Sequence, residues 1–227
     1  MLLHDDLGAL TATIREGRRV FANLQRAFLY LIGFKVMVIS LAILAPLLGL
    51  PILLMLVQLV WLELIVHPVS AVAFESDPGP ESMMDEPPRD PGAPLVVARA
   101  ALRSVLCGAL LAAGALAIYA TRLSGGGPYA RGVAMAVVVG GSLAMVWAEL
   151  AGAEPWWRVS VPRAFRFWVV IAVVAASVPI CMTVPMLAGV LEMRLIDPRD
   201  WLLAAALVIV ATGWRAFGTR WFMPTRS

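Results

Sequence analysis

Apolar residues gather along this chain in long runs, and short polar segments rich in Arg, Pro and Gly separate these runs. A helix needs about 20 mostly apolar residues to cross the hydrocarbon core of a bilayer. Six runs reach or approach this length, and the last is the shortest. The pattern therefore predicts an all-α membrane protein, a bundle of six transmembrane helices. We expect these helices over residues 27–48, 52–74, 97–119, 132–150, 165–187 and 201–214.

The polar segments between the predicted helices carry turn signals. Gly49 can end the first helix and Pro51 can occupy the first turn of the second, so these two helices are predicted to form a tight hairpin. The glycine-rich residues 124–128 predict a turn between the third and fourth helices. Asp197-Pro198 is typical of a helix start, with an N-cap followed by proline at the first helical position.

A charged segment without proline, residues 11–26, leads directly into the first apolar run. It predicts a cytoplasmic stalk helix that continues into the membrane without a break. Gly17 lies inside this segment, where glycine costs about 1 kcal/mol relative to alanine. It therefore indicates either close packing or a flexing point. Residues 75–96 are acidic and rich in proline, and they predict a loop rather than a domain.

Composition and charge agree with a membrane protein. The chain is 61% hydrophobic, whereas soluble domains are nearer half apolar. The arginines flank the apolar runs instead of forming a patch, which argues against binding to nucleic acid. With both termini in the cytoplasm, most arginines fall on the inner face, as the positive-inside rule requires. The outer face then holds Arg122, Arg131, Arg194 and Arg199.

Three polar side chains in the first two predicted spans form a candidate ion site. Lys35 lies in the first span, while Glu63 and His67 are four residues apart in the second and share one helix face. Pro68 has no N–H to donate, so it leaves the carbonyl of Leu64 without its helical partner. Transporters build ion sites from such broken turns and polar groups. A Lys35–Glu63 ion pair that only locks the two helices is the alternative.

Two motifs carry a resemblance to a known family. The stalk segment contains Thr13-Ile14-Arg15-Glu16-Gly17-Arg18, and the loop after the second predicted span contains MMDEPPRDP at residues 83–91. Together they resemble the C-terminal transmembrane region of P-type cation-transporting ATPases of the calcium and sodium/potassium pump type. Those pumps carry an (A/V)xxEGR stalk, two spans and an MxxPPRxP loop. The motifs end near residue 94, and the chain resembles a truncated bacterial member.

The resemblance implies a division of the chain and a location. The protein would be an integral protein of a bacterial plasma membrane. The polar loop and both termini would lie in the cytoplasm. The expected parts are the tail of a missing cytoplasmic phosphorylation domain (1–10), the stalk helix (11–26), a first helical hairpin with the ion site (27–74), a cytoplasmic Pro-rich loop (75–96), four further spans (97–214) and a cytoplasmic basic tail (215–227).

The resemblance also implies where ions would bind. The ligand positions of calcium-type pumps in these two spans correspond here to Lys35, Val38, Glu63, Val66 and His67. Because only Glu63 is an acid or amide, and Ca²⁺ takes about six to eight oxygen ligands, calcium is not the expected ion. Lys, Glu and His together favour a proton, or a cation that moves against a proton.

Two further residues are secondary candidates for the ion site. One is Pro68, at the broken turn. The other is Glu149, at the end of the fourth predicted span, which corresponds by resemblance to a site acid of the pumps' eighth span. The alternative for Glu149 is an interfacial acid at a helix end.

The chain lacks the sequences through which P-type pumps use ATP. The phosphorylation motif DKTGT and the Mg²⁺-site motif GDGxND do not occur. The resemblance therefore implies that ATP and Mg²⁺ bind in missing N-terminal pump domains, and that this chain holds no cofactor and does not hydrolyse ATP alone. Its expected partners are those domains, the lipid bilayer and a transported cation. Two alternatives remain open: a six-span secondary transporter or channel subunit, and a pump-derived membrane scaffold without transport.

Overall fold

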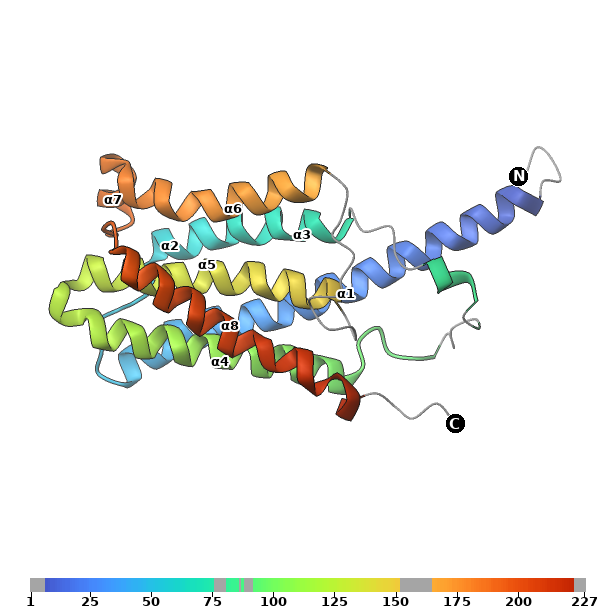
Figure 1. The fold of residues 1–227 in the computed structure, drawn as a ribbon, viewed down its shortest axis with the longest axis horizontal. Helices are drawn as coiled ribbons and strands as arrows, with labels where there is room; N and C mark the ends of the chain where they lie inside the picture. The colour runs from blue at the N-terminus through green and yellow to red at the C-terminus, as the bar shows by residue number, and fades with distance from the viewer. Residues whose placement is uncertain (1–6, 76–80, 86, 88–91, 152–164, 223–227) are drawn as a thin grey trace.

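The computed structural model describes residues 7–75, 81–85, 87, 92–151 and 165–222. Within these ranges the regular structure is entirely helical, and it forms the all-α bundle that the sequence predicts (Figure 1). The elements in chain order are α1 (Leu7–Leu47), α2 (Leu56–Trp61), η1 (Leu62–Val66), α3 (His67–Glu75), η2 (Glu81–Met84), α4 (Ala98–Arg122), η3 (Leu123–Gly125), α5 (Gly127–Ala151), α6 (Phe165–Thr183), α7 (Pro185–Val190) and α8 (Pro198–Phe222).

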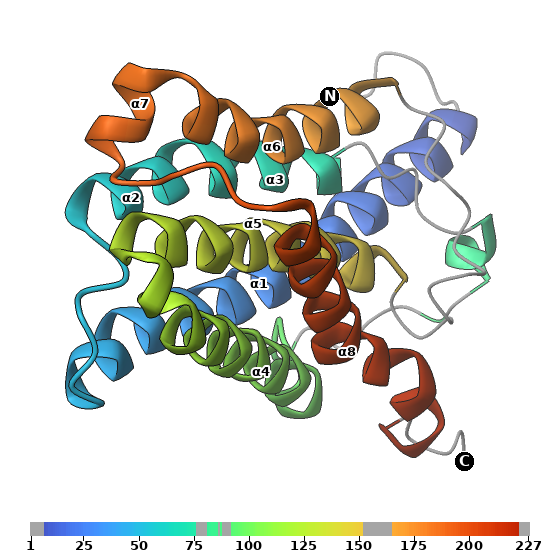
Figure 2. The same ribbon diagram turned by 60° about the vertical axis from the view of Figure 1, so that its left-hand side comes forward.

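The helices run back and forth along the bundle (Figure 1). The start of α1 and the end of α8 lie at one end, which we call the stalk end. The α4–α5 connection and α7 lie at the opposite end, the turn end. α5 is central: it contacts α1, α4, α6 and α8, while α6 packs on α3 (Figure 2). The predicted spans correspond to α1, α2–η1–α3, α4, α5, α6 and α8.

Several of these helices suit a membrane. Among the described residues, three helices are long and apolar enough to cross one, Gly8–Leu47, Ala98–Gly125 and Gly127–Ala151. Shorter apolar helices cover Leu56–Val66 and Phe167–Thr183. The apolar part of Gly127–Ala151 is 72% buried, against 33% for Gly8–Leu47. The central helix is thus shielded by protein, while α1 leaves much of its apolar surface for other contacts.

The stalk and the first span are one continuous helix, α1, of 41 residues. The helix passes through Gly17 without a break, and a Cβ built there would meet no atom within 4 Å. The interpretation of Gly17 as a site of close packing is therefore wrong for the described part of the chain. Contacts are instead made by Arg18, which donates to the carbonyl of Met83 at 2.8 Å. The two motif-bearing segments therefore touch.

The connection between the first two spans differs from the predicted tight hairpin. α1 ends as expected, with Gly49 at φ 71° and the Leu50 N–H donating to the Ala45 carbonyl. The second helix, however, begins at Leu56, so the prediction that Pro51 starts it is wrong. Local turn signals could not reveal this because the cause is tertiary.

Side chains of α4 and α5 bind the backbone between α1 and α2 and stabilise it in a non-helical conformation. The Tyr119 hydroxyl donates to the Pro51 carbonyl at 3.2 Å, and Arg131 donates to the Ile52 carbonyl at 3.2 Å through two nitrogens. The next residues, Leu53 and Leu54, are buried in the core. These partners satisfy backbone groups that a helix would otherwise bond internally.

The later turn predictions are confirmed. Gly126, at φ 101°, separates η3 from α5, and Pro198 is the first residue of α8. α8 continues to Phe222, beyond the predicted span. Parts of the predicted N-terminal tail, Pro-rich loop and C-terminal tail lie outside the described residues.

Small residues allow α1 and α4 to approach backbone to backbone. A Cβ on Gly108 would lie 2.2 Å from the Gly33 carbonyl oxygen, and one on Gly33 would lie 2.9 Å from the Ser104 carbonyl oxygen. Close approach through small residues is a common way for membrane helices to associate, because lipid leaves no hydrophobic drive between them. The Gly33–Gly108 crossing therefore fixes the spacing of α1 and α4.

We predict that Gly108→Ala lowers the stability of the bundle by about 1–3 kcal/mol, the usual range for overpacking a tight contact. The reason is that the new methyl group would meet backbone, which cannot rotate away. Reversible unfolding of the purified protein in mixed micelles measures the change. Gly213→Ala is the matched control, because a Cβ there meets no atom within 4 Å. Equal stability of the Gly108 variant and the parent would contradict the tight crossing.

Candidate ion site

The second spanning segment changes its helical winding where the candidate residues lie. Between α2 and α3, residues Leu62–Val66 form a π-helical turn, and the His67 N–H donates to the Leu62 carbonyl five residues back. Pro68 follows at once and cannot donate a backbone hydrogen bond. π-turns inside helices are frequent at functional sites because they reorient side chains. Here the turn carries Glu63.

Lys35 and Glu63 meet across the α1–η1 contact. The Lys35 Nζ lies 2.6 Å from Oε1 and 2.5 Å from Oε2 of Glu63, so the ammonium binds both carboxylate oxygens. The side chains retain 41% and 35% of their exposure. Each charge neutralises the other in a region where an isolated charge would be costly. The open side of the pair is not covered by described residues.

His67 lies against aromatic side chains of α1. Its ring stacks on Tyr30, with centroids 6.0 Å apart and planes inclined by 8°, and on Phe34 at 5.5 Å and 19°. Both aromatic residues are almost fully buried. The imidazole makes no hydrogen bond to a described residue, so its polar atoms are not committed within that part of the chain. Phe34 directly precedes Lys35 in α1, and Glu63 lies four residues before His67, so the imidazole lies next to the ion pair.

The structure therefore brings together the three primary candidates, Lys35, Glu63 and His67, with Pro68 at the adjoining start of α3. That they bind an ion stays a prediction. The sequence analysis did not single out Tyr30 and Phe34, the two aromatic residues on which His67 stacks. Their spacing could have indicated a shared aromatic surface, because residues four apart lie on one face of a helix.

Glu149, the other secondary candidate, belongs to a separate group. Its side chain is 3% exposed, and its Oε1 accepts hydrogen bonds from Ser104 Oγ at 2.9 Å and from Arg215 at 2.8 Å. These partners come from α4 and α8. Sequence reasoning missed Arg215 as a partner because it placed this residue in a cytoplasmic tail. An arginine directly after an apolar run can equally lie in the same helix and turn inward.

The chemistry of both groups is that of a carboxylate with a built-in cation. Lys35 stands beside Glu63, and Arg215 stands beside Glu149. Among the described residues, no group of three or more His, Cys, Asp or Glu side chains could hold a metal ion. A carboxylate of this kind can exchange a proton or release its internal cation. It does not offer the oxygen shell that a hard divalent cation needs.

One comparison with known proteins bears on the identity of the chain. The family described as cation transporting ATPase, C-terminus, matches residues 51–221. The match includes Glu63, His67, Pro68 and Glu149 and runs far beyond the motifs that end near residue 94. It begins after Lys35 and the stalk. The match favours a P-type pump over the two alternatives, a six-span secondary transporter or channel subunit and a membrane scaffold without transport. The chain belongs to this family, the C-terminal membrane region of P-type cation-transporting ATPases.

Proposed function

We propose that this chain supplies part of the cation pathway of a P-type pump, with Glu63 as the group that exchanges the transported proton or coordinates the transported cation. The observation that carries the proposal is the Lys35–Glu63 pair, held in a π-turn of an apolar helix. Lys35 is the internal counter-charge. His67 tunes the proton affinity of Glu63 or acts as a second proton carrier, because imidazole is the side chain that most readily exchanges a proton at physiological pH.

The proposed cycle uses competition for Glu63. When the ammonium of Lys35 binds both carboxylate oxygens, it occupies one lone pair of each, and its positive charge repels a transported cation. Movement of α1 relative to η1 separates the pair and opens the carboxylate. Return of Lys35 expels whatever Glu63 has bound. Because α1 carries both the stalk and Lys35, a rotation of the stalk would move Lys35 relative to Glu63.

The energy for such a cycle would come from partner domains. P-type pumps form a covalent aspartyl-phosphate from ATP. The phosphorylation and Mg²⁺-site motifs do not occur in this chain. We therefore assign ATP and Mg²⁺ to N-terminal pump domains that work with this chain.

We predict that Glu63→Gln abolishes cation transport in vesicles by a pump assembled from this chain and those N-terminal domains, while membrane insertion stays intact. The amide is nearly isosteric but cannot carry the exchangeable charge. Glu192→Gln is the control, since Glu192 also forms an ion pair, with Arg131 at 2.6 Å, but outside the site. Transport at the parental rate by the Glu63 variant would leave the pair with a purely structural role.

We further predict that Lys35→Met slows cation release without lowering binding, because the internal competitor for Glu63 is lost. The measurement is the rate of radiolabelled cation release after a single turnover. The double variant Lys35→Met/Glu63→Gln separates a structural role from a mechanistic one. If the pair serves only stability, the double variant transports normally once folded, and the proposal fails.

We propose that the stalk end faces the cytoplasm of a bacterial cell and the turn end faces outward. The arginine distribution along the sequence supports this orientation. A membrane-impermeant thiol reagent applied from outside should label a cysteine at Ser124 and leave one at Asp85 unlabelled. Both positions are exposed. The native Cys107 and Cys181 are buried and are replaced by alanine for the test. Labelling at Asp85 from outside would reverse the orientation.

A further inference from the structure

The turn end of the bundle holds a hollow lined by charged side chains. Its volume is about 500 Å³, and its walls come from the end of α4, the α4–α5 connection, the first turn of α5 and residues 194–200. The lining includes Arg122, Tyr129, Arg194, Asp197, Arg199 and Asp200. This hollow lies at the opposite end of the bundle from the stalk. Nothing in the proposed cation pathway uses it.

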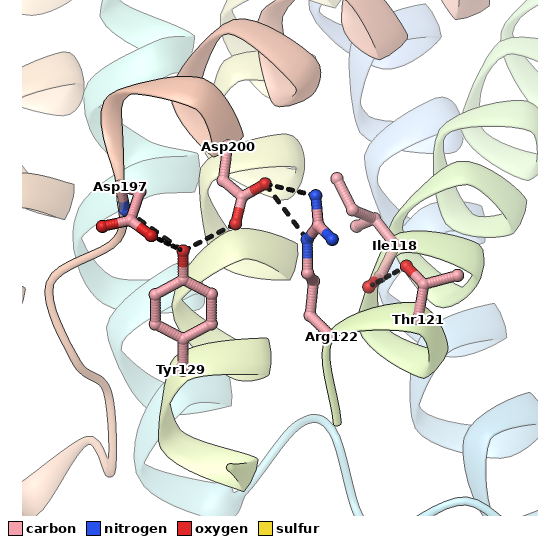
Figure 3. A network of polar contacts seen from close by, with 6 residues as sticks. All are labelled: Ile118, Thr121, Arg122, Tyr129, Asp197 and Asp200. Carbon is pink, nitrogen blue, oxygen red and sulfur yellow. Dashed lines mark hydrogen bonds and ion pairs between the residues drawn. The ribbon is translucent and has the colours of Figure 1, made fainter. Parts of the chain in front are cut away.

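One wall of the hollow is internally neutralised (Figure 3). Asp200 is 4% exposed, and its Oδ1 accepts hydrogen bonds from Arg122 Nε at 3.1 Å and from Arg122 NH2 at 2.6 Å. The hydroxyl of Tyr129 donates to Oδ2 of Asp200 at 2.6 Å. The acceptor capacity of Asp200 is therefore largely used, and its charge is balanced by Arg122.

Two cations on the rim of the hollow are not balanced in this way. Arg194 and Arg199 are exposed, and neither side chain makes a hydrogen bond or ion pair with the described part of the chain. The carboxylate left to face them is Asp197, whose Oδ2 lies 3.1 Å from the Tyr129 hydroxyl. The formal charge of the lining is therefore positive, with three arginines against two aspartates.

Backbone contacts hold the rim in place. The Arg194 N–H donates to the Pro128 carbonyl at 3.1 Å, and the Asp197 N–H donates to the Tyr129 hydroxyl at 3.2 Å (Figure 3). These bonds fasten the segment before α8 to the first turn of α5. The backbone that carries the arginines is therefore already fixed, and only their side chains have to be ordered when an anion binds, which favours affinity.

We propose that this hollow binds a phosphate group. Guanidinium groups match phosphate oxygens in geometry and charge, and paired arginines bind them with short, charge-assisted hydrogen bonds. Arg194 and Arg199 supply the unpaired donors, and Arg122 is held by Asp200 in the same lining. α4 ends and α5 begins beside the hollow, and both helices are long enough to span a membrane. The hollow therefore lies at the level of the lipid head groups. A phospholipid and free phosphate share the required chemistry.

The test uses the full chain, purified in an uncharged detergent. Binding is measured by titration with inorganic phosphate, and separately with a short-chain phosphatidylglycerol. Sodium chloride of equal ionic strength and a short-chain diacylglycerol without phosphate are the blanks. We expect Arg194→Gln/Arg199→Gln to weaken binding at least about tenfold, the loss expected from one charge-assisted hydrogen bond. Asp197→Asn should tighten it, because a repelling carboxylate is removed.

Arg15→Gln/Arg99→Gln is the matched control, since it removes the same charge from exposed positions at the stalk end. Its affinity should equal that of the parent. Binding of the lipid alone identifies a head group as the ligand, and binding of both probes identifies the phosphate group itself. Binding of inorganic phosphate alone identifies a free anion. If neither probe binds, if the Arg194/Arg199 variant binds like the parent, or if the control loses as much affinity, the proposal is overturned.

Discussion

α1 and α4 meet backbone to backbone at Gly33 and Gly108, and each of these helices carries a side chain that binds a carboxylate of the bundle. Lys35 follows Gly33 by two residues, about 200° around the helix, so it projects away from α4 and toward η1. Ser104 lies one turn before Gly108 and reaches Glu149 on α5.

The charges inside the bundle are neutralised in pairs. An apolar surrounding provides no counter-charge, so a carboxylate there needs an internal cation, a proton or a bound ion. Lys35 fills this need for Glu63, and Arg215 fills it for Glu149. The two pairs differ in burial, since the Glu149 pair is almost inaccessible and the Lys35–Glu63 pair is half exposed. The accessible pair is the one placed at the π-turn.

The two ends of the bundle differ in how firmly their segments are held together. At the turn end, side-chain hydrogen bonds join connections that are distant in sequence. Tyr119 donates to the Pro51 carbonyl, Gln58 donates to the Leu191 carbonyl, and Arg131 donates to both the Ile52 carbonyl and Glu192. At the stalk end, α1 extends beyond the bundle and contacts the following loop through a few side chains, such as Arg18. A tied turn end and a helix that projects from the stalk end suit a domain on which force acts from one side.

The sequence alone determined the helical membrane bundle and the turns at Gly126 and Pro198, because these depend on local composition. Helical spacing also singled out Lys35, Glu63 and His67 as candidates for the ion site, which stays a prediction. Only the tertiary structure decided that Pro51 stays outside the second helix, that Glu149 pairs with Arg215 and that Gly17 faces open space. Each of these depends on side chains that are distant in sequence. A carbonyl or carboxylate takes the nearest donor in space, and the order of residues does not reveal which donor that is.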